Sequence, residues 1–409
     1  MDRNSPESNM RVFSKADILL PKDTDLSKWS CIACDQFTSK KAYWEKCYDI
    51  VGEADSTLNL IIPEAYLDTH SPEVDNKKIF STMKAYLDKN IFRLLKDSMV
   101  YVRREVSGNK IRQGIIGKVD LEAYSWKSGE DAGIRATEET IESRLPVRSA
   151  VRRVALIELP HIILFLNDIE NKIIPSAAGG EILYDFELMQ GGGRVTGSHI
   201  STSEAERIEH QIENLQTQGT KIAVGDGNHS LAAAKYYWDS IKNKLSADEI
   251  KSHPSRFALV ELVNVYDSAI NIEPIHRAVI NSNVINFMSL AEDALKGAGD
   301  LKIKIARGNE NKEIRTKFNS FGELVANVDI FFAKHIKANG GIIDYIHGDE
   351  DAIKLANADN SAAILLPKPV KEKIFTYIEE NGSYPKKSFS VGEARDKRYY
   401  LECRKITLN

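Results

Sequence analysis

Hydrophobic and polar positions alternate along much of the chain, in stretches that have the length of β-strands. Two such stretches, 98–106 and 111–119, are separated by a polar turn at 107–110, and this arrangement predicts a β-hairpin. The stretch 257–265 is apolar at nearly every position, which is typical of a central strand buried on both faces of a sheet. Between residues 79 and 95 the apolar positions recur at helical spacing and predict an amphipathic helix.

Predicted strands and helices alternate through most of the chain, for example a strand at 162–166 and a helix at 203–215. This alternation predicts an α/β or mixed α+β protein in which helices flank mixed sheets. We expect a flexible leader over 1–10, a main α/β domain over 11–290 that carries the candidate motifs, and a smaller α+β subdomain over 291–409. A single integrated unit is the alternative for the last two parts.

The composition agrees with a folded globular protein and narrows the classes of partner. Of 409 residues, 42% are hydrophobic and 28% are charged, and the formal net charge is −4. A slightly negative chain has no general attraction to nucleic acid or to anionic membranes. Because the first residues are polar and no apolar run is long enough to span a bilayer, we expect a cytoplasmic protein without nucleic-acid or membrane partners. The sequence leaves the oligomeric state open.

Cys31 and Cys34 form a CxxC pair, a spacing found in redox sites and in zinc sites. A zinc site would need a second CxxC or a suitably spaced pair of histidines, and neither follows in the sequence. The segment 29–34 also alternates as a strand does, and buried cysteine behaves as a small apolar residue. We therefore expect a structural role for this pair.

The most informative segment is 221–235, where a short β-branched run ends in a glycine-bearing turn and an alanine-rich helical run follows. Such a junction points backbone N–H groups and the positive end of a helix at one spot, which suits an anion such as phosphate. The turn has no GxxxxGK[ST] motif, so it is not a Walker A loop. The alternative is an ordinary turn in which Asp226 caps the helix. The turn offers a carboxylate, an amide, an imidazole and a hydroxyl, from Asp226, Asn228, His229 and Ser230.

Arginine and glutamate are concentrated in 133–153, where Thr137, Thr140 and Glu142 resemble a capped helix start. On such a helix Arg144 lies about one turn after Thr140, and Arg148 follows one turn later. An arginine row of this kind can hold phosphate through paired N–H groups. The alternative is a solvated helix whose glutamates and arginines pair with one another.

Three further polar segments are candidates for a site or for structural roles. Glu158 and His161 stand at a predicted strand end, where they could bind a metal or supply a base, although a packed histidine is the expectation. His276 and Arg277 follow the apolar strand 257–265 and could reach an anionic ligand, or could only position the next helix. The charged segment 392–398 is expected to form a turn with surface ion pairs.

These motifs, in this order, resemble the domain of unknown function 1015 family over nearly the whole chain. The family leaves the activity open, because its name states that none is known. Many members carry Ala-Asp-Gly-His-His-Arg at the turn, where this chain has Asn228 and Ser230. This chain lacks the arginine of that motif, so Arg135, Arg144 or Arg277 would have to make its phosphate contact. The segments that carry the resemblance are Ala33–Ser39, Ile134–Thr140, Glu158–His161, Asp226–His229, Pro274–Arg277 and Gly392–Tyr400.

The Asp226–His229 turn also resembles, over fewer than ten residues, the signature of the ParB/sulfiredoxin-like superfamily. Members of that superfamily hold nucleotide phosphates at such a turn, and some are phosphotransferases, including a free-serine kinase. The resemblance implies that this chain binds ATP or ADP with Mg²⁺ and phosphorylates a small hydroxylated metabolite. A DNA-binding role of the ParB kind is disfavoured by the negative charge and by the absence of a long basic stripe.

Our leading hypothesis is therefore a metabolic enzyme that binds a phosphate-bearing small molecule and phosphorylates a metabolite such as serine. In this hypothesis Asp226 coordinates Mg²⁺, and Glu139 or His229 accepts the proton of the substrate hydroxyl. The alternative is a sensor that binds a nucleotide or metabolite without turnover. The residues expected to contact the ligand are Arg135, Arg144, Gly227, Asn228, Ser230, His276 and Arg277.

Overall fold

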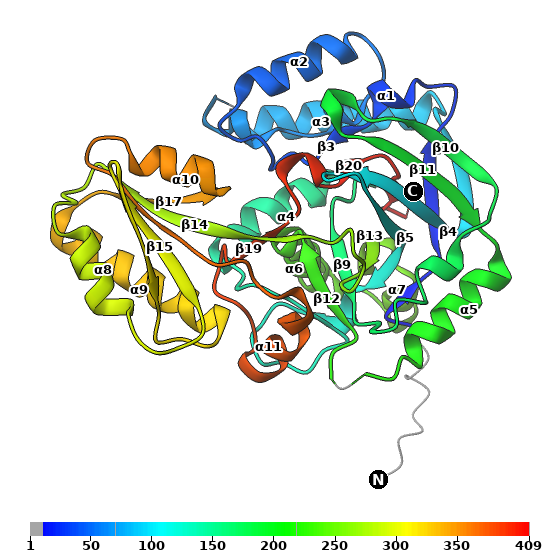
Figure 1. Cartoon of the computed structure of the whole chain (residues 1–409). Helices are drawn as coiled ribbons and strands as arrows, with labels where there is room; N and C mark the ends of the chain where they lie inside the picture. Colours follow the sequence, from blue (N-terminus) through cyan, green and yellow to red (C-terminus); the bar gives the residue numbers. More distant parts are fainter. Residues whose placement is uncertain (1–10, 70, 218, 409) are drawn as a thin grey trace. The chain divides into compact units, whose positions relative to one another are not determined.

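The computed structural model describes residues 11–69, 71–217 and 219–408, and the predicted leader over 1–10 lies outside them (Figure 1). The chain divides into two compact units: unit 1 is Met1–Ile270 with Gly392–Asn409, and unit 2 is Asn271–Val391. This division differs from the boundary at 290 that the sequence suggests. It lies earlier because strand β14 (Ile272–Ile280) pairs with strands of unit 2, while the last segment of the chain pairs with strands of unit 1.

Unit 1 is built on a large mixed sheet with the strand order β10-β11-β4-β5-β13-β9-β12-β7-β6, to which β1 and β2 add by pairing with β5 and β4. The pairs β13–β9, β12–β7 and β6–β7 are parallel and the others are antiparallel. The mixed sheet with flanking helices confirms the predicted fold class. Its strands are β1 (Phe13–Ser14), β2 (Ala16–Pro21), β4 (Phe92–Val106), β5 (Lys110–Asp120), β6 (Tyr124–Ser125), β7 (Ile134–Arg135), β9 (Ile163–Leu166), β10 (Ile182–Glu187), β11 (Arg194–Ile200), β12 (Ile222–Asp226) and β13 (Phe257–Asn264).

The predicted hairpin is present as β4 and β5, with Val106 opposite Lys110 across the turn. Side chains on a strand alternate between the two faces of the sheet. Val100 of β4 therefore packs into one hydrophobic cluster, with Trp29 and Trp44, while Tyr101 packs into a second one, with Trp238. The predicted central strand β13 is buried along almost its whole length, because both clusters cover it.

Helices cover the two faces of this sheet, and short ladders complete unit 1. The predicted helix over 79–95 ends earlier, at Asp88, because Asn90 takes a left-handed backbone conformation (φ 52°) and β4 begins at Phe92. The helices are α1 (Leu26–Trp29), α2 (Lys41–Val51), α3 (Pro72–Asp88), α4 (Leu145–Val154), α5 (Thr202–Glu213), α6 (Asn228–Lys242) and α7 (Ala247–Ser252), and the short strands are β3 (Cys31–Ile32), β8 (Ile157–Glu158), β20 (Tyr399–Tyr400) and β21 (Arg404–Lys405). Short 3₁₀ turns include η3 (Leu121–Ala123), η4 (Glu142–Arg144), η7 (Pro254–Arg256) and η9 (Ala394–Asp396).

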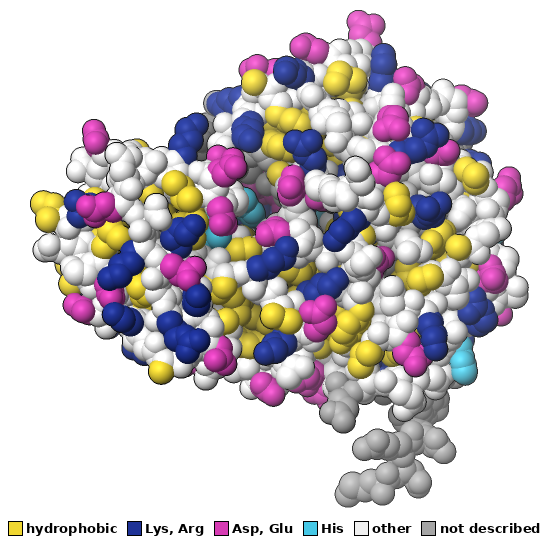
Figure 2. Space-filling model, viewed as in Figure 1, with side chains coloured by type: hydrophobic (Ala, Val, Ile, Leu, Met, Phe, Trp, Pro, Cys, Tyr) yellow, Lys and Arg dark blue, Asp and Glu magenta, His cyan; other side chains and the backbone are white. Residues whose placement is uncertain are grey.

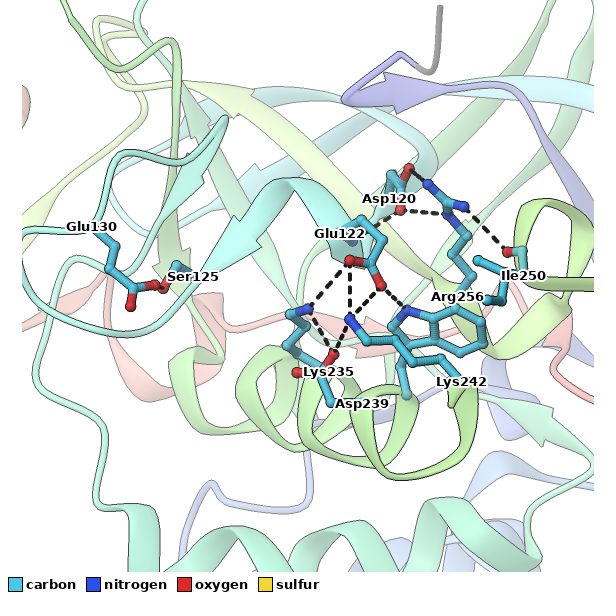
Figure 3. Close-up of polar contacts among 10 residues, drawn as sticks. Asp120, Glu122, Ser125, Glu130, Lys235, Asp239, Lys242, Ile250 and Arg256 are labelled. Atoms are coloured by element: carbon cyan, nitrogen blue, oxygen red, sulfur yellow. Dashed lines mark hydrogen bonds and ion pairs between the residues drawn. The ribbon is translucent and has the colours of Figure 1, made fainter. Parts of the chain in front are cut away.

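Helix α6 is anchored to the sheet by a polar network near its C-terminal end (Figure 3). The carboxylate of Glu122 accepts hydrogen bonds from Lys242 Nζ (2.9 Å) and from the indole N–H of Trp238. Lys235 pairs with Asp239 one turn along the same helix, at 2.8 Å. These contacts, with the burial of Trp238, fix the helix against the sheet and so fix the place of its N-terminal end.

Unit 2 contains a sheet of order β16-β15-β18-β14-β17, in which β19 also pairs with β14. Its core packs Phe287 of α8 against Phe331 and Phe332 of α9, with ring centroids 5.2 and 5.6 Å apart. The strands are β14 (Ile272–Ile280), β15 (Lys302–Arg307), β16 (Glu310–Arg315), β17 (Ile342–His347), β18 (Ala362–Leu365) and β19 (Phe389–Val391), and the helices are α8 (Phe287–Leu295), α9 (Phe321–Asn339), α10 (Asp349–Ala356) and α11 (Ile374–Asn381).

The surface of the chain carries mixed charge. On the face in Figure 2, Lys and Arg side chains are interspersed with Asp and Glu side chains. This distribution agrees with the small net charge of −4. Among the helices within the described residues, none has both the length and the apolar character that crossing a bilayer requires.

Candidate functional site

The turn between β12 and α6 has the predicted strand–turn–helix form. Gly227 precedes the helix in the left-handed conformation (φ 84°), which glycine adopts without a steric cost. A Cβ atom added at Gly227 would lie 3.2 Å from Ile162 Cα. The close approach of the segment at Ile162 therefore also favours glycine at this position. The first amides of an α-helix have no partner within the helix, and the helix dipole makes this end positive. The turn is thus suited to an anion.

Asp226 at the end of β12 forms an ion pair with Lys397, its Oδ2 lying 3.0 Å from Nζ. The Lys397 side chain is 6% exposed and the Asp226 side chain 24% exposed, so the pair is largely shielded from water. The other carboxylate oxygen of Asp226, Oδ1, accepts a hydrogen bond from Gly227 N at 3.1 Å. Asp226 therefore does not serve as a simple helix cap, because the cap position belongs to Gly227.

The segment that carries Lys397 is held by a buried ionic network. Arg104 donates to the backbone carbonyls of residues 395–397, and Arg112 donates to the carbonyl of Asp396 at 2.7 Å. Arg398 binds Glu261 of β13 at 3.0 Å. The turn expected over 392–398 is present as η9, but the expectation of surface ion pairs is wrong, because the pairs of Lys397 and Arg398 are buried. Tertiary contacts with β4, β5 and β13 override the local polarity.

Burial acts to raise the pKa of Glu261, but Arg112, Arg398 and Arg104 outweigh it and keep that pKa below its ordinary value. Glu261 is therefore ionised at neutral pH. A buried carboxylate that is paired in this way costs stability when one partner is removed, because the remaining charge stays buried. The network thus fixes the backbone on which Lys397 and Tyr400 are placed.

Residues 136–141 form a loop that the turn holds in place. Asn228 Oδ1 accepts from Thr137 N at 3.2 Å, and Thr137 Oγ1 donates to the carbonyl of Val224 at 2.6 Å. His229 Nε2 accepts from Ile141 N at 3.3 Å. The helix predicted from Thr137 onward is therefore wrong, because α4 begins only at Leu145. The side chains of the turn supply hydrogen bonds that a helix would otherwise have made.

Ser230, in the first turn of α6, contacts His161 at the end of the neighbouring segment. Ser230 Oγ lies 3.0 Å from His161 Nε2, and His161 Nδ1 lies 3.1 Å from Tyr400 Oη. Tyr400 Oη in turn lies 3.3 Å from both the amide N and the Sγ of Cys34. His161 is half-buried, and both of its ring nitrogens have protein partners, as the packed strand-end histidine favoured by the sequence would have.

Asp35 belongs to the same surroundings. Burial acts to raise its pKa, but His161, a hydrogen bond from Gln36, Lys397 and Arg148 outweigh that effect and lower it. Asp35 is therefore ionised at neutral pH. Arg148, which also pairs with Glu64 at 2.8 Å, adds a further positive charge. We call Asp226, Gly227, Asn228, His229 and Ser230, with Lys397, His161 and Asp35, the turn site.

The remaining candidates of unit 1 lie in different settings. Arg135 is buried in β7, next to Ala223 of β12 across a parallel ladder. Glu139 is exposed on the loop that Asn228 and His229 hold. Arg144 is exposed at the end of η4, so the arginine row predicted on a continuous helix does not form.

His276 and Arg277 make structural contacts within unit 2. Arg277 is fully buried in β14, where its guanidinium binds Asp329 at 2.8 Å and donates to three backbone carbonyls. His276 Nε2 lies 3.0 Å from Asp349 Oδ1, and its Nδ1 accepts from Leu366 N at 3.1 Å. The hydrogen-bonding capacity of both side chains is used inside unit 2, which argues against a phosphate contact by either of them.

The two cysteines of the CxxC pair are free thiols, one buried and one partly buried. Cys31 is buried in β3, and burial raises the pKa of its thiol. Burial also raises the pKa of Cys34 to about 12, so its sulfur is a thiol at neutral pH. Within the described part of the chain, no three His, Cys, Asp or Glu side chains gather as a metal site would require.

A separate hollow of about 500 Å³ in unit 1 shares no residue with the turn site. Lys118, Arg404 and Lys405 are among its lining residues. Arg404 is already paired with Glu158 at 2.6 Å, and Lys118 lies 4.6 Å from the ring centroid of Phe257. Because Arg404 and Lys118 have protein partners, they are less available to an anion.

The sequence did not give chemical roles to Asp35, Lys397 or Tyr400. The family resemblance could have pointed to these three residues, because two of the segments that support it, 33–39 and 392–400, contain them. Five of those six segments supply residues to unit 1, and their side chains meet around the turn. The contacts join residues far apart in the chain, which periodicity and spacing do not reveal.

Among solved structures, the chain is similar to several proteins at low identity. A free serine kinase in complex with AMP is 11% identical with a TM-score of 0.38, over 71% of this chain and 91% of that one. A truncated SbnI from Staphylococcus aureus is 8% identical with a TM-score of 0.38, over 68% and 82%. A conserved hypothetical protein from Pyrococcus furiosus is 11% identical with a TM-score of 0.33, over 69% and 90%. Because these TM-scores are below 0.5, the similarity says nothing about the residues of the site.

Sequence comparison gives a stronger result for the family. No curated protein matches the chain. A family model described as "Protein of unknown function (DUF1015)" matches residues 15–382, which include the turn itself, while Lys397 and Tyr400 lie beyond the match. Because the match spans nearly the whole chain, the resemblance carried by the motifs is confirmed, and the protein belongs to the DUF1015 family.

Proposed function

We propose that the chain binds a phosphate-bearing small molecule at the N-terminal end of α6 and transfers a phosphoryl group to a small hydroxylated metabolite such as serine. The observation that carries this proposal is the shielded Asp226–Lys397 pair beside the left-handed turn at Gly227. A lysine ammonium next to the positive end of a helix supplies charge and N–H donors in one place. This combination is what a phosphate requires.

A second feature supports a ligand at this place. Thr140, on the loop that His229 holds, has a buried hydroxyl for which the described residues provide no hydrogen-bond partner. A buried hydroxyl without a partner lowers stability by about 1–3 kcal/mol. A phosphate oxygen would accept its hydrogen bond and remove that cost.

Within the proposal, Lys397 and the amide of Asn228 neutralise the phosphate, and Asp226 orients Lys397 through their ion pair. Glu139 accepts the proton of the substrate hydroxyl, because its carboxylate is exposed on the adjoining loop. His229 is less suited to that task, since its Nε2 already accepts from Ile141 N.

A nucleotide with Mg²⁺ is the donor that the family resemblance implied, and the metal fits the residues poorly. The carboxylate of Asp226 already pairs with an ammonium group, and no gathering of metal-ligating side chains occurs in the described ranges. Mg²⁺ in proteins is held by one or two carboxylates with water and phosphate oxygens. We therefore assign Mg²⁺ no step and leave the charge neutralisation to Lys397.

Binding without turnover is the second candidate function. The side chains of Asn228 and His229 accept hydrogen bonds from the backbone of the loop 136–141. These two polar side chains of the turn therefore have a structural role. A turn of that kind could couple ligand binding to the position of the loop. The protein would then act as a sensor of a nucleotide or a phosphorylated metabolite.

A thermal-shift experiment tests the proposal, with pyrophosphate, ATP, ADP and AMP, each with and without Mg²⁺. Binding to the folded state raises the melting temperature by mass action. The expected result is a shift with pyrophosphate or a nucleotide that Lys397→Met removes and Lys405→Met, an exposed control, preserves. Incubation with ATP and serine, followed by ³¹P NMR, then separates the two candidates, because an enzyme consumes the ligand and a sensor does not. No shift with any of the four ligands would contradict the proposal.

A further inference from the structure

Four side chains of unit 1 form a continuous hydrogen-bonded series that the proposed function does not use. The series runs from Ser230 Oγ to His161 Nε2 (3.0 Å), from His161 Nδ1 to Tyr400 Oη (3.1 Å), and from Tyr400 Oη to Cys34 Sγ (3.3 Å). A hydroxyl, a base within hydrogen-bond reach and a third group that orients the base are the marks of an activated nucleophile. The edge-to-face contact of the His161 and Tyr400 rings, with centroids 5.6 Å apart, fixes the plane of the imidazole.

The partners of Tyr400 favour one tautomer of the neutral His161 ring. The Tyr400 hydroxyl donates its hydrogen to Cys34 Sγ, and its oxygen accepts from the Cys34 amide. With its one proton directed at Cys34 Sγ, Tyr400 Oη accepts from His161 Nδ1–H when the imidazole is neutral. In that tautomer His161 Nε2 faces Ser230 Oγ as a hydrogen-bond acceptor. Burial raises the pKa of Tyr400 well above its ordinary value, so its hydroxyl keeps that proton.

The surroundings of Ser230 favour negative charge on its oxygen. Ser230 lies in the first turn of α6, a helix of 15 residues, where the unpaired amides and the helix dipole are directed. Asp226, two residues before the helix in the same turn, brings its ion pair with the Lys397 ammonium group to this end of α6. A phosphoryl group attached to Ser230 would find the charge and the N–H donors that the proposed function assigns to a phosphate.

We propose that Ser230 is a nucleophile activated by His161 and that the phosphoryl group passes through it; this deepens the proposed function and rests on it. In the first step Ser230 Oγ attacks the phosphorus of a phosphoanhydride. The Oγ–P bond forms, the bond from phosphorus to the leaving oxygen breaks with its electron pair, and the Ser230 proton moves to His161 Nε2. The products are phosphoserine at 230 and the shortened donor.

The second step returns the protein to its starting state. The hydroxyl oxygen of the acceptor attacks phosphorus, the Oγ–P bond breaks, and Ser230 Oγ takes back its proton from His161 Nε2. The acceptor proton goes to the carboxylate of Glu139 and from there to water. Tyr400 is a positioning residue, because it acts only by holding the His161 ring and its Nδ1 proton.

A fluorophosphonate probe tests the nucleophile without knowledge of the substrate. Attack by an activated serine forms an Oγ–P bond and releases fluoride, while the serine proton leaves through the base. We expect the intact wild-type chain to gain one probe mass, and peptide mapping to place it on Ser230. Ser230→Ala abolishes the label, whereas Ser240→Ala, an exposed serine of the same helix, retains it. No label on the wild-type chain, or a label that persists in Ser230→Ala, would overturn the inference.

The base and its positioning residue have separate readouts. We expect His161→Ala to slow labelling by at least about 100-fold, and added imidazole to restore part of the rate. Tyr400→Phe should slow labelling less and shift the pH midpoint of the labelling rate, which loss of packing alone would not move. A labelling rate that His161→Ala leaves unchanged would overturn the role of His161.

The same proteins separate this inference from the proposed function. A melting-temperature shift with pyrophosphate in the wild type, without any fluorophosphonate label on it, would keep the phosphate site and overturn the nucleophile. Labelling of Ser230 without any shift for pyrophosphate or nucleotides would keep an activated serine and overturn its role in phosphoryl transfer. Both results together, a label and a shift, support the two-step mechanism.

Discussion

The turn site of unit 1 and the His276–Arg277 segment of unit 2 are both polar motifs that the sequence offers to an anion, and the structure uses them differently. The turn follows the buried strand β12, whereas His276 and Arg277 lie within the buried strand β14. Arg277 is fully buried, and Asp329 and backbone carbonyls occupy its donors. Asp226 keeps 24% of its side-chain surface exposed, and its partner Lys397 comes from the last segment of the chain. A polar motif is therefore a candidate site when contacts within the protein do not occupy all of its hydrogen-bonding groups.

The energetics of the two regions follow from this difference. Removing one member of a buried, saturated ion pair leaves an uncompensated charge, so its main effect is on stability. The two pairs are similarly exposed, at 0% and 25% for Arg277 and Asp329 and at 6% and 24% for Lys397 and Asp226. Arg277 also donates to three backbone carbonyls, so replacing Lys397 leaves fewer groups without a partner and should cost less stability. Mutations that separate stability from binding therefore test the comparison directly.

The largest expected effect is on unit 2. Arg277→Met should lower the free energy of unfolding by about 3–5 kcal/mol, because Asp329 and three carbonyls lose their donor in a buried place. Urea unfolding followed by circular dichroism measures the change, with Arg315→Met as an exposed control in the same unit. A loss below about 1 kcal/mol would place Arg277 among weakly held surface arginines instead.

The next effect is on ligand affinity at the turn site. Lys397→Met should weaken pyrophosphate binding by about 10- to 100-fold, since a charge-assisted hydrogen bond contributes about 1.5–3 kcal/mol. Asp226→Asn should abolish phosphoryl transfer while the protein stays folded, because Lys397 loses the partner that orients it. Titration calorimetry and a turnover assay measure the two outcomes. Equal affinity in Lys397→Met and in Lys405→Met would remove Lys397 from the ligand site.

A smaller effect is expected from acid. Burial lowers the pKa of His276 below its ordinary 6.5, with Arg277 acting in the same direction and Asp349 and Glu273 acting against both. The unfolded chain then binds more protons than the folded one, so stability is full above pH 6.5 and falls as the pH drops below that value. We expect the free energy of unfolding to decrease as the pH is lowered from 7 to 5.

His276→Asn keeps an acceptor for Leu366 N and removes the titrating ring. Thermal unfolding between pH 7 and pH 5 should be less dependent on pH in this variant than in the wild type. The matched control is His210→Asn, at an exposed helix end in unit 1. An unchanged pH dependence in His276→Asn would show that other groups cause the acid sensitivity.

The smallest effect concerns Arg144, which the sequence offers as a phosphate contact and the structure places, exposed, at the end of η4. Arg144→Gln should change the free energy of unfolding by less than about 0.5 kcal/mol. Its effect on pyrophosphate affinity should stay below about fivefold, the range of an exposed charge pair. A loss as large as that in Lys397→Met would bring Arg144 into the turn site.

Local sequence patterns predicted correctly those elements whose tertiary contacts favour the same secondary structure as their own residues do. The hairpin β4–β5, the buried strand β13 and the strand–turn–helix junction at Gly227 all follow from spacing and turn residues. The helix predicted over 79–95 runs too far, because the chain turns at the left-handed residue Asn90 and β4, which pairs with β2, begins at Phe92. The loop 136–141 looks helical by its capping residues, yet Asn228 and His229 bind its backbone instead.

By itself, the sequence determined the fold class, the family and the chemical groups of the turn, because these depend on periodicity, motif order and residue type. Only the tertiary structure decided which side chains meet there. Lys397, His161 and Tyr400 reach the turn because strand register and the buried network of Arg104, Arg112 and Glu261 fix the backbones that carry them. Contacts between distant residues depend on the packing of the whole unit, and no local pattern of hydrophobic and polar positions contains that information.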